Sequence, residues 1–399
     1  MKLKRIAGLD LLCCMVYFMS YVTRLDYAAC LTAIVNDLNV TKQLASIAVT
    51  GSFITYSVGQ IISGILGDII KPRKLIALGL AGTSLINLSM VFLPDIHWMT
   101  GFWCFNGFFQ ALLWPPLVRL MAENMTGDEY SKAVVSVSAS ASVATILIYI
   151  IVPAAIAVSG WRLVFVIASV SGIASALVWL RFTGNIRENG NLQKVSGSSA
   201  PSENRLSSVV PLLIPIMAAI CLQGILRDGI TTWMPTYIYE VFDLGLSMSI
   251  LTTAILPIFS IISLKIAARI NKSIGNELKT SMLLFGTSFA AAAIMIPMFS
   301  KSVLLCALLM AVITGCMHGI NLMLIGNLPA HFAKYGKVST VSGLLNACTY
   351  VGSALSTYGF AALSESFGWG FTIASWAVIA GVGLALCLML TGKWKRFCA

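Results

Sequence analysis

Twelve apolar runs, each about 20 residues long or longer, follow one another along this chain. A helix of about 20 residues crosses the roughly 30 Å of hydrocarbon in a bilayer. Hydrophobic residues make up 58% of the chain and charged residues only 10%, whereas soluble domains carry about 25% charged residues. The sequence therefore predicts an all-α membrane protein with twelve transmembrane helices. We expect these helices at residues 9–36, 44–66, 74–94, 98–121, 133–157, 162–181, 208–239, 247–268, 280–299, 302–328, 338–362 and 370–391.

The basic residues indicate how the chain is oriented in the membrane. The first apolar run is too long for a cleavable signal and lacks a small-residue cleavage site, so we expect it to remain as the first helix. With the N-terminus in the cytoplasm, 21 of the 26 Lys and Arg fall on the inner side, and only Lys42, Arg162 and Lys301 fall outside. This bias predicts that both termini lie in the cytoplasm. We also expect a multi-pass protein of a bacterial cytoplasmic membrane. The net charge of +11 is then a topology signal, and we expect no nucleic-acid partner.

A polar stretch, TGNIRENGNLQKVSGSSAPSENRLSS at residues 183–208, interrupts the apolar runs. Its Ser, Asn and Gly content predicts a flexible cytoplasmic linker. It divides the chain into two six-helix bundles, residues 1–182 and 209–399.

The two halves echo each other. Arg24 and Arg227 lie in the first apolar run of each half, and an acid, Asp37 or Glu240, follows thirteen residues later. The last run of each half is entered through SGW at 159–161 or FGW at 367–369. These repeats predict two pseudo-symmetric bundles with a substrate site at their interface, the plan of repeat-built transporters.

The two arginines are the residues that most need a function, because a charge within a bilayer is costly. Tyr17, Tyr21 and Arg24 are spaced i, i+4 and i+7, which places them on one helical face. Two guanidinium forks suit a phosphate or carboxylate group. The alternative is structural pairing with Asp26 or Asp228. Neither acid is ideally placed for this, since Asp26 is about 200° around the helix from Arg24 and Asp228 about 100° from Arg227.

Polar residues in other runs leave more than one interpretation open. The fifth and eleventh runs carry stripes that either line a cavity or join helices, namely Ser138, Ser142, Thr145 and Tyr149, and Ser342, Asn346, Thr349 and Ser353. His318 either lines the cavity and takes up a proton or bonds a neighbouring backbone group. Tyr350 either contacts substrate or only packs. Trp114-Pro115-Pro116 predicts a broken or bent helix.

The sequence contains no signature of catalysis. The ten cysteines lack ligand spacing, and we expect no metal site, no disulfide and no cofactor. No nucleophile–base pair is visible, and no phosphate-binding loop of the G-x-x-x-x-G-K-S/T type occurs. We therefore do not expect an enzyme or an ATP-driven pump.

The loop after the second run, GILGDIIKPRK at residues 64–74, resembles a signature of the major facilitator superfamily. Gly64, Asp68, Arg73 and Lys74 match it, and Pro72 replaces the usual glycine. The resemblance implies the major facilitator fold, with a cytoplasmic gate. We assign that gate to Asp68, Arg73, Lys74 and Arg119.

A closer resemblance, to the organophosphate:inorganic phosphate antiporter family, covers nearly the whole chain. It is carried by YVTR and DYAACL around Arg24, by LLWPPLVR at 112–119 and by LRDGITTWMPTYI at 226–238. It implies that Arg24 and Arg227 bind a phosphoryl group and that Tyr17, Tyr21 and Tyr56 belong to the site. Members of the family carry glycerol-3-phosphate or hexose phosphates.

The chain departs from the glycerol-phosphate members at three positively charged or titratable positions. It has Leu25 and Gln60 where they have lysines, and Ser142 where they have a histidine. Asp26 and Asp228 stand beside the arginines and are candidates for coupling or charge balance. A monoanion, a phosphodiester or a zwitterion is then a plausible substrate. The predicted substrate-binding residues are Tyr17, Tyr21, Arg24, Tyr56, Gln60, Ser142, Arg227, His318, Asn346 and Tyr350.

These observations predict a monomeric secondary transporter for a small organic anion, a phosphorylated metabolite. We expect alternating access and exchange for inorganic phosphate. One alternative is a proton-coupled organic-anion symporter in which Asp26, Asp228 or His318 carries the proton. A second alternative is a transport-like sensor that binds an external metabolite and signals to a partner.

Overall fold

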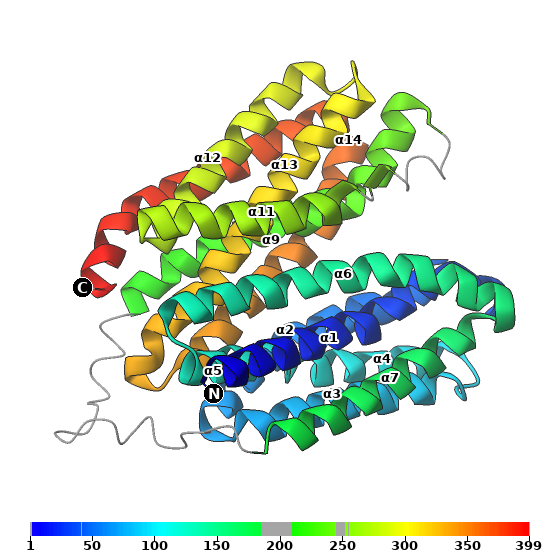
Figure 1. The fold of residues 1–399 in the computed structure, drawn as a ribbon. Coiled ribbons are helices and arrows are strands. Elements are labelled where there is room, and N and C mark those ends of the chain that lie inside the picture. Colours follow the sequence, from blue (N-terminus) through cyan, green and yellow to red (C-terminus); the bar gives the residue numbers. More distant parts are fainter. Residues whose placement is uncertain (1, 41, 185–209, 245–251, 254, 399) are drawn as a thin grey trace. The chain divides into compact units, whose positions relative to one another are not determined.

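The computed structural model describes residues 2–40, 42–184, 210–244, 252–253 and 255–398 (Figure 1). Most of the predicted linker, residues 185–208, lies outside this described part. The described residues form helices and no strand, which confirms the all-α prediction.

The chain divides into two compact units. The first contains residues 1–200 and 332–347, and the second contains residues 201–331 and 348–399. The segment 332–347 therefore packs with the first unit, although it lies within the second half of the sequence. The helices of the first unit are α1 (Lys2–Leu38), α2 (Lys42–Ile69), α3 (Pro72–Met90), α4 (Ile96–Ala111), α5 (Trp114–Asn124), α6 (Gly127–Ser159) and α7 (Trp161–Phe182). The later helices are α9 (Val210–Phe242), α11 (Ile255–Ile274), α12 (Glu277–Met295), η2 (Ile296–Met298), α13 (Val303–Asn321), η3 (Leu322–Asn327), η4 (Leu328–Tyr335) and α14 (Val338–Cys398).

The described helices correspond to the twelve predicted segments. The fourth segment is split into α4 and α5 because Pro115 and Pro116 cannot continue the hydrogen-bond ladder of α4. The eleventh and twelfth segments together form α14, which turns at Gly368, where φ is +76°. In the described part, eight helices are by length and composition alone apolar enough to cross a membrane.

The internal repeat has a structural counterpart in each unit. Gly160 and Gly368 both have positive φ, +77° and +76°, a conformation that favours glycine. The tryptophan that follows each glycine donates a hydrogen bond to the acid of its own unit. Trp161 Nε1 lies 3.0 Å from Asp37 Oδ2, and Trp369 Nε1 lies 2.8 Å from Glu240 Oε2. In each unit, the tryptophan of the repeated Gly-Trp pair thus forms the same hydrogen bond with the repeated acid.

Within the first unit, α1 packs against α6 and α7, α2 against α4, and α3 against α7 (Figure 1). A buried polar network joins α1, α3 and α4. Its centre is Thr23, whose carbonyl accepts from Asn87 Nδ2 at 3.2 Å and Asn106 Nδ2 at 3.0 Å, and whose hydroxyl accepts from Gln110 Nε2 at 2.8 Å. Because groups buried in lipid have no water to bond, this network fixes the rotation of α1 next to Arg24.

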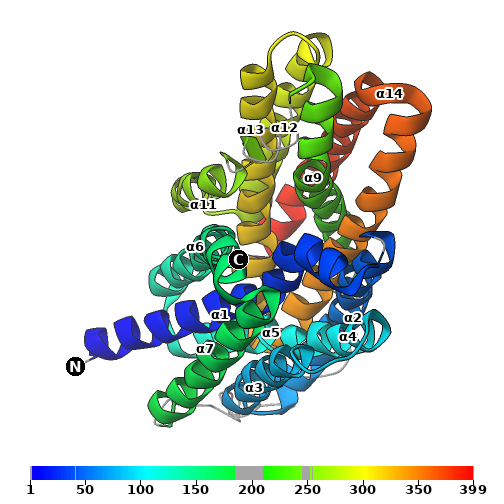
Figure 2. The same ribbon diagram turned by 90° about the vertical axis from the view of Figure 1, so that its right-hand side faces the viewer.

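Within the second unit, α13 packs against α9, α11 and α12, and Figure 2 shows α9 and α13 side by side. Glycines allow α9 and α14 to approach closely. A Cβ at Gly224 would overlap the Thr349 carbonyl, and one at Gly352 would overlap the Cys221 carbonyl. This close approach places Arg227 of α9 near the polar residues of α14.

Candidate functional site

Arg24 lies within an aromatic cluster of the first unit. Its Cζ is 4.3 Å from the Tyr21 ring centroid and 5.3 Å from that of Tyr56. Tyr17 extends the cluster, with ring centroids 5.3 Å from Tyr21 and 4.6 Å from Trp114. The helical face predicted from the spacing of Tyr17, Tyr21 and Arg24 is therefore present, and aromatic faces hold the guanidinium in place by cation–π attraction.

Gln60 and Asn346 meet in the same unit. Asn346 Nδ2 donates to Gln60 Oε1 at 3.0 Å, and Gln60 Nε2 donates to the Ala111 carbonyl at 3.2 Å. The Gln60 amide is thus engaged as both donor and acceptor inside the protein. Ser142 is buried on α6, the helix that packs along α1 through a hydrogen bond from Ser140 Oγ to the Cys14 carbonyl.

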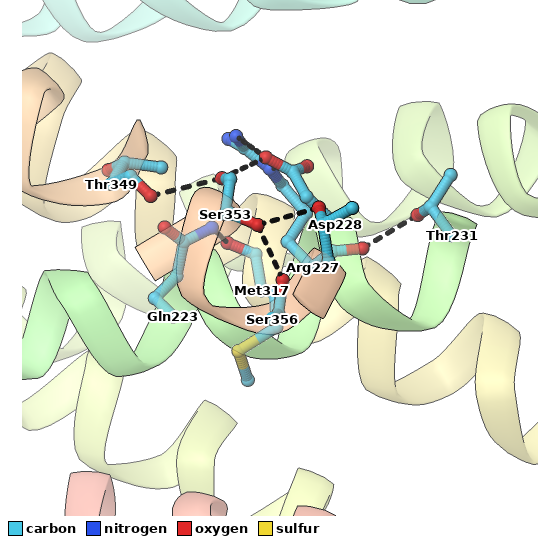
Figure 3. A network of polar contacts seen from close by, with 9 residues as sticks. Gln223, Arg227, Asp228, Thr231, Met317, Thr349, Ser353 and Ser356 are labelled. Carbon is cyan, nitrogen blue, oxygen red and sulfur yellow. Dashed lines mark hydrogen bonds and ion pairs between the residues drawn. The ribbon is translucent and has the colours of Figure 1, made fainter. Parts of the chain in front are cut away.

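Arg227 forms a two-pronged ion pair with its neighbour Asp228 in the second unit (Figure 3). Nε lies 2.7 Å from Oδ1, and Nη2 lies 2.8 Å from Oδ2. The Ser353 hydroxyl of α14 donates to Asp228 Oδ2 as well. This ion pair corrects our expectation that Asp228 is not ideally placed to pair with Arg227, and it matches the alternative of structural pairing that the sequence left open. The backbone directions do diverge by about 100°, but the long arginine side chain folds back across that angle.

Two further predicted residues lie near this pair. Tyr350 places its ring centroid 6.0 Å from Arg227 Cζ. His318 of α13 lies within electrostatic range of both Arg227 and Asp228. Gln223, one turn before Arg227, donates through Nε2 to the Met317 carbonyl at 2.9 Å and so ties α9 to α13 beside His318 (Figure 3).

Asp26 has a different environment from Asp228. It is fully buried, and its Oδ1 accepts from the adjacent Tyr27 backbone amide at 2.8 Å. Its Oδ2 accepts no hydrogen bond from any described residue. The two acids beside the arginines are therefore not equivalent.

Three of the four residues predicted for a gate make side-chain contacts near helix ends. The charge pattern predicts that these ends face the cytoplasm. Asp68 accepts from the Ser339 and Thr340 backbone amides, at 2.9 and 2.8 Å, and so caps the start of α14. Arg119 donates to the Gly67 carbonyl at 2.6 Å and pairs with Glu123 at 2.7 Å. Arg73 donates to the Leu180 carbonyl at 2.6 Å.

Lys74 lies beside Arg73 in the first turn of α3, and its backbone amide donates to the Lys71 carbonyl. Pro72, which replaces the usual glycine of the motif, occupies the first turn of α3, where a missing backbone donor does no harm. The departure at Pro72 thus has a local structural reason.

Sequence reasoning missed the polar network around Thr23. Its members Thr83 and Asn87 are spaced i, i+4, as are Asn106 and Gln110, all inside apolar runs. Thr83 Oγ1 donates to Asn106 Oδ1, and Gln110 Nε2 also donates to Thr83 Oγ1 at 2.9 Å. That spacing of polar side chains was a signal that could have identified them.

Comparisons with known proteins agree on the family. The model of the Major Facilitator Superfamily matches residues 11–357. A probable hexose phosphate transport protein of Chlamydia pneumoniae is 23% identical over 94% of this chain and 88% of its own length. The membrane sensor protein UhpC of Salmonella typhimurium is also 23% identical, over 93% of this chain and 88% of its own length.

A solved structure supports the fold. The outward-facing bacterial homologue of the iron transporter ferroportin superposes with a TM-score of 0.70, at 11% sequence identity and over 98% of this chain and 99% of that one. At this identity the likeness concerns the fold alone. The helices, the repeated Trp–acid contact and the family match lead to one conclusion: this chain is a multi-pass, all-α membrane protein that belongs to the major facilitator superfamily.

Proposed function

We propose that this protein is a secondary active transporter of a small phosphorylated organic anion that works by alternating access. The observation that carries the proposal is the pair of arginines at repeat-equivalent positions, with two tyrosine rings near the Arg24 guanidinium and one near that of Arg227. Arginine forks bind phosphoryl oxygens in pairs. A relative described as a probable hexose phosphate transport protein supports the same substrate class.

Arg24 and Arg227 bind the anionic group in this proposal, and Tyr17, Tyr21, Tyr56 and Tyr350 contribute the surrounding aromatic surface. Gln60, Ser142, His318 and Asn346 complete the predicted set. Leu25 and Gln60 add no positive charge, and Asp228 already neutralises Arg227. These features favour a substrate with a single negative charge, such as a phosphodiester or a zwitterion, over a dianionic sugar phosphate.

Exchange for inorganic phosphate is the coupling we propose first, from the resemblance to the antiporter family. In an exchanger, the empty carrier faces a high barrier to reorientation when an arginine charge in its core lacks a counter-ion, so only the loaded carrier moves. The protein then works as a monomer in a bacterial cytoplasmic membrane with both termini inside. Asp68, Arg73, Lys74 and Arg119 stabilise the closed cytoplasmic side.

One observation favours proton-coupled symport as a second candidate. The Arg227–Asp228 pair neutralises the arginine without any phosphate. An incoming anion that takes over the Arg227 fork would release Asp228, which can then accept a proton. The empty carrier regains the internal pair and returns without a counter-substrate.

The sensor alternative is favoured by the relative described as a membrane sensor, which is as similar in sequence as the hexose phosphate relative. A sensor would bind the metabolite without moving it. Binding and transport must therefore be measured separately.

Uptake into proteoliposomes tests the three candidates. Labelled hexose phosphates and phosphodiesters are offered with and without trapped phosphate, at a fixed pH gradient of either sign. We expect uptake that requires trapped phosphate. Uptake into phosphate-free vesicles that follows the proton gradient and disappears in Asp228→Asn would replace exchange with symport. Binding without uptake in any condition would contradict transport and favour the sensor.

A further inference from the structure

Several buried side-chain oxygens of the first unit make no hydrogen bond within the part of the chain that the structure describes, and three of them lie on helices that pack against one another. These three are Asp26 Oδ2 on α1, Asn87 Oδ1 on α3 and Ser169 Oγ on α7. All three residues are 0% exposed. Buried polar atoms in folded proteins are nearly always paired, so each exception points to something that the protein side chains do not supply, such as a water or an ion.

The packing of the three helices brings these residues to one level. A Cβ at Gly172 of α7 would overlap Ser84 Oγ of α3 and lie 3.5 Å from Thr23 Cγ2 of α1, so the three helices meet there. The start of α7 contacts the end of α1, through Trp161 and Asp37. Its end contacts the start of α3, through Trp179 Nε1 and the Arg73 carbonyl at 3.1 Å. Helix α7 therefore runs antiparallel to both α1 and α3.

One helical turn from this meeting point lie the three residues with unpaired oxygens. Asp26 and Asn87 each follow a contact residue, Thr23 or Ser84, by three positions, and Ser169 precedes Gly172 by three. Because α7 is antiparallel to α1 and α3, moving three residues forward on α1 and α3 and three residues back on α7 leads in the same direction. Each move covers about 4.5 Å along the helix axis and ends on nearly the same face of its helix. Asn87 Nδ2 also donates to the Thr23 carbonyl at 3.2 Å, which holds its side chain against α1. The helix geometry thus places the three residues along one seam.

The chemistry of this seam suits a small cation. Asp26 has no ion-pair partner among the described residues, and Arg24 lies about 200° away around the helix. A water molecule would bond the oxygens without neutralising a carboxylate, and a proton on Asp26 would supply a single O–H donor, which can bond only one of the other two oxygens. A hard cation both bonds the oxygens and neutralises the carboxylate, because carboxylate, amide and hydroxyl oxygens are its preferred ligands.

We propose that Asp26, Asn87 and Ser169 bind Na⁺ between α1, α3 and α7. A single carboxylate matches a monovalent ion, whereas Ca²⁺ sites gather six to eight oxygens and Mg²⁺ demands an octahedral shell that retains water. This departs from our expectation, from the cysteines, that the chain has no metal site. The bound ion joins the helix that carries Arg24 to α3 and α7, one turn from the Thr23 network.

Thermal unfolding of the purified full chain tests the site without substrate. The chain is heated in NaCl, KCl or choline chloride at equal ionic strength and constant pH, since a ligand that binds only the folded state raises its stability with concentration. We expect a saturable rise in Tm specific to Na⁺, matched by binding of ²²Na⁺. Asp26→Asn should abolish both effects. Ser169→Ala should weaken Na⁺ by roughly ten- to a hundredfold, the scale for losing one supporting group at a metal site.

The matched control is Ser84→Ala, which lies one turn away in the same seam but bonds its own Leu80 carbonyl at 2.6 Å. It should keep the wild-type Na⁺ affinity. If Asp26→Asn fails to fold, comparing the Na⁺ affinities of Ser169→Ala and Ser84→Ala still tests the site. Equal Tm in the three salts, a Tm that follows pH instead of Na⁺, or equal Na⁺ affinity of Ser169→Ala and wild type would overturn the site.

The effect of Na⁺ on uptake rests on the proposed transport function and is measured separately. We expect Na⁺ to increase uptake of the labelled anion and Ser169→Ala to require more Na⁺ for the same rate. A Na⁺-dependent Tm without any uptake would support the site and contradict transport. Uptake with no Na⁺ effect on Tm would support transport and overturn the site.

Discussion

Replacing Asp228 with asparagine tests how the second unit balances the charge of Arg227. The variant keeps the shape of the side chain but removes its negative charge. In the wild type, the two carboxylate oxygens lie 2.7 and 2.8 Å from the Nε and Nη2 atoms of Arg227. Removing one partner from a fully buried ion pair costs about 3–5 kcal/mol. The side chains of Arg227 and Asp228 are 12% and 31% exposed, so solvent screens part of this cost. We expect Asp228→Asn to destabilise the protein by about 2 kcal/mol.

Phosphate should reverse part of that loss. The proposed function makes a phosphoryl group the natural ligand of the Arg227 fork, and Asp228 competes for the same donors. Inorganic phosphate should therefore raise the Tm of Asp228→Asn more than that of the wild type. The assay is thermal unfolding of both proteins in detergent over a series of phosphate concentrations at constant ionic strength.

An exposed ion pair provides the control. Arg162 and Asp37 also lie 2.7 Å apart, but their side chains are 42% and 47% exposed. Asp37→Asn should cost no more than about 1 kcal/mol, as for surface pairs, and should not respond to phosphate. If Asp228→Asn and Asp37→Asn behave alike with and without phosphate, Arg227 is not an anion-binding residue and the charge argument fails.

Four other predictions follow from single contacts. Arg24→Lys keeps the charge but loses the fork and should weaken substrate binding by about 1.5–3 kcal/mol in a competition assay; unchanged affinity in a folded variant would make Arg24 structural. Gly224→Val should sharply lower the folded yield because its side chain would overlap the Thr349 carbonyl, whereas Gly286→Val, whose nearest neighbour is Leu384 at 3.7 Å, should not. Hydrogen bonds from Arg162 and Trp161 lower the pKa of Asp37. Their small contribution to folding stability is therefore present above about pH 4 and is lost as the pH falls through the lowered pKa. Arg162→Ala should reduce the fall in Tm that acid causes. Single cysteines at Ser198 and Ser302, in an otherwise cysteine-free chain, should react with impermeant reagents from opposite sides, and outside labelling of Ser198 in intact cells would contradict the topology.

The sequence predicted the elements of the fold well because lipid imposes a simple rule. An apolar run long enough to cross the bilayer must be helical, since no water is present to pair its backbone. The repeat was also visible, because Asp37, Glu240, Trp161 and Trp369 are polar or aromatic residues at matching places in both halves.

Side-chain partners were harder to predict. The pairing of Arg227 with Asp228 depends on how a long side chain bends, which the angular spacing of Cβ atoms does not determine. The grouping of residues 332–347 with the first unit depends on contacts such as that of Asp68 with Ser339 and Thr340, far away in sequence. The position of Gln60 against Asn346 likewise follows only from three-dimensional packing.

The spacing between the arginine and its neighbouring acid differs by one residue between the two halves, and this difference has physical consequences. In the second half the acid follows its arginine directly, and a flexible side chain spans the 100° between them to form an internal ion pair. In the first half the acid comes one residue later, which turns it to the far side of α1 from Arg24. There it lies in the seam of α1, α3 and α7 with an oxygen that no described residue pairs. In our proposals, this shift of one residue within a repeated motif separates a carboxylate that competes with an anion for arginine from one that holds a cation.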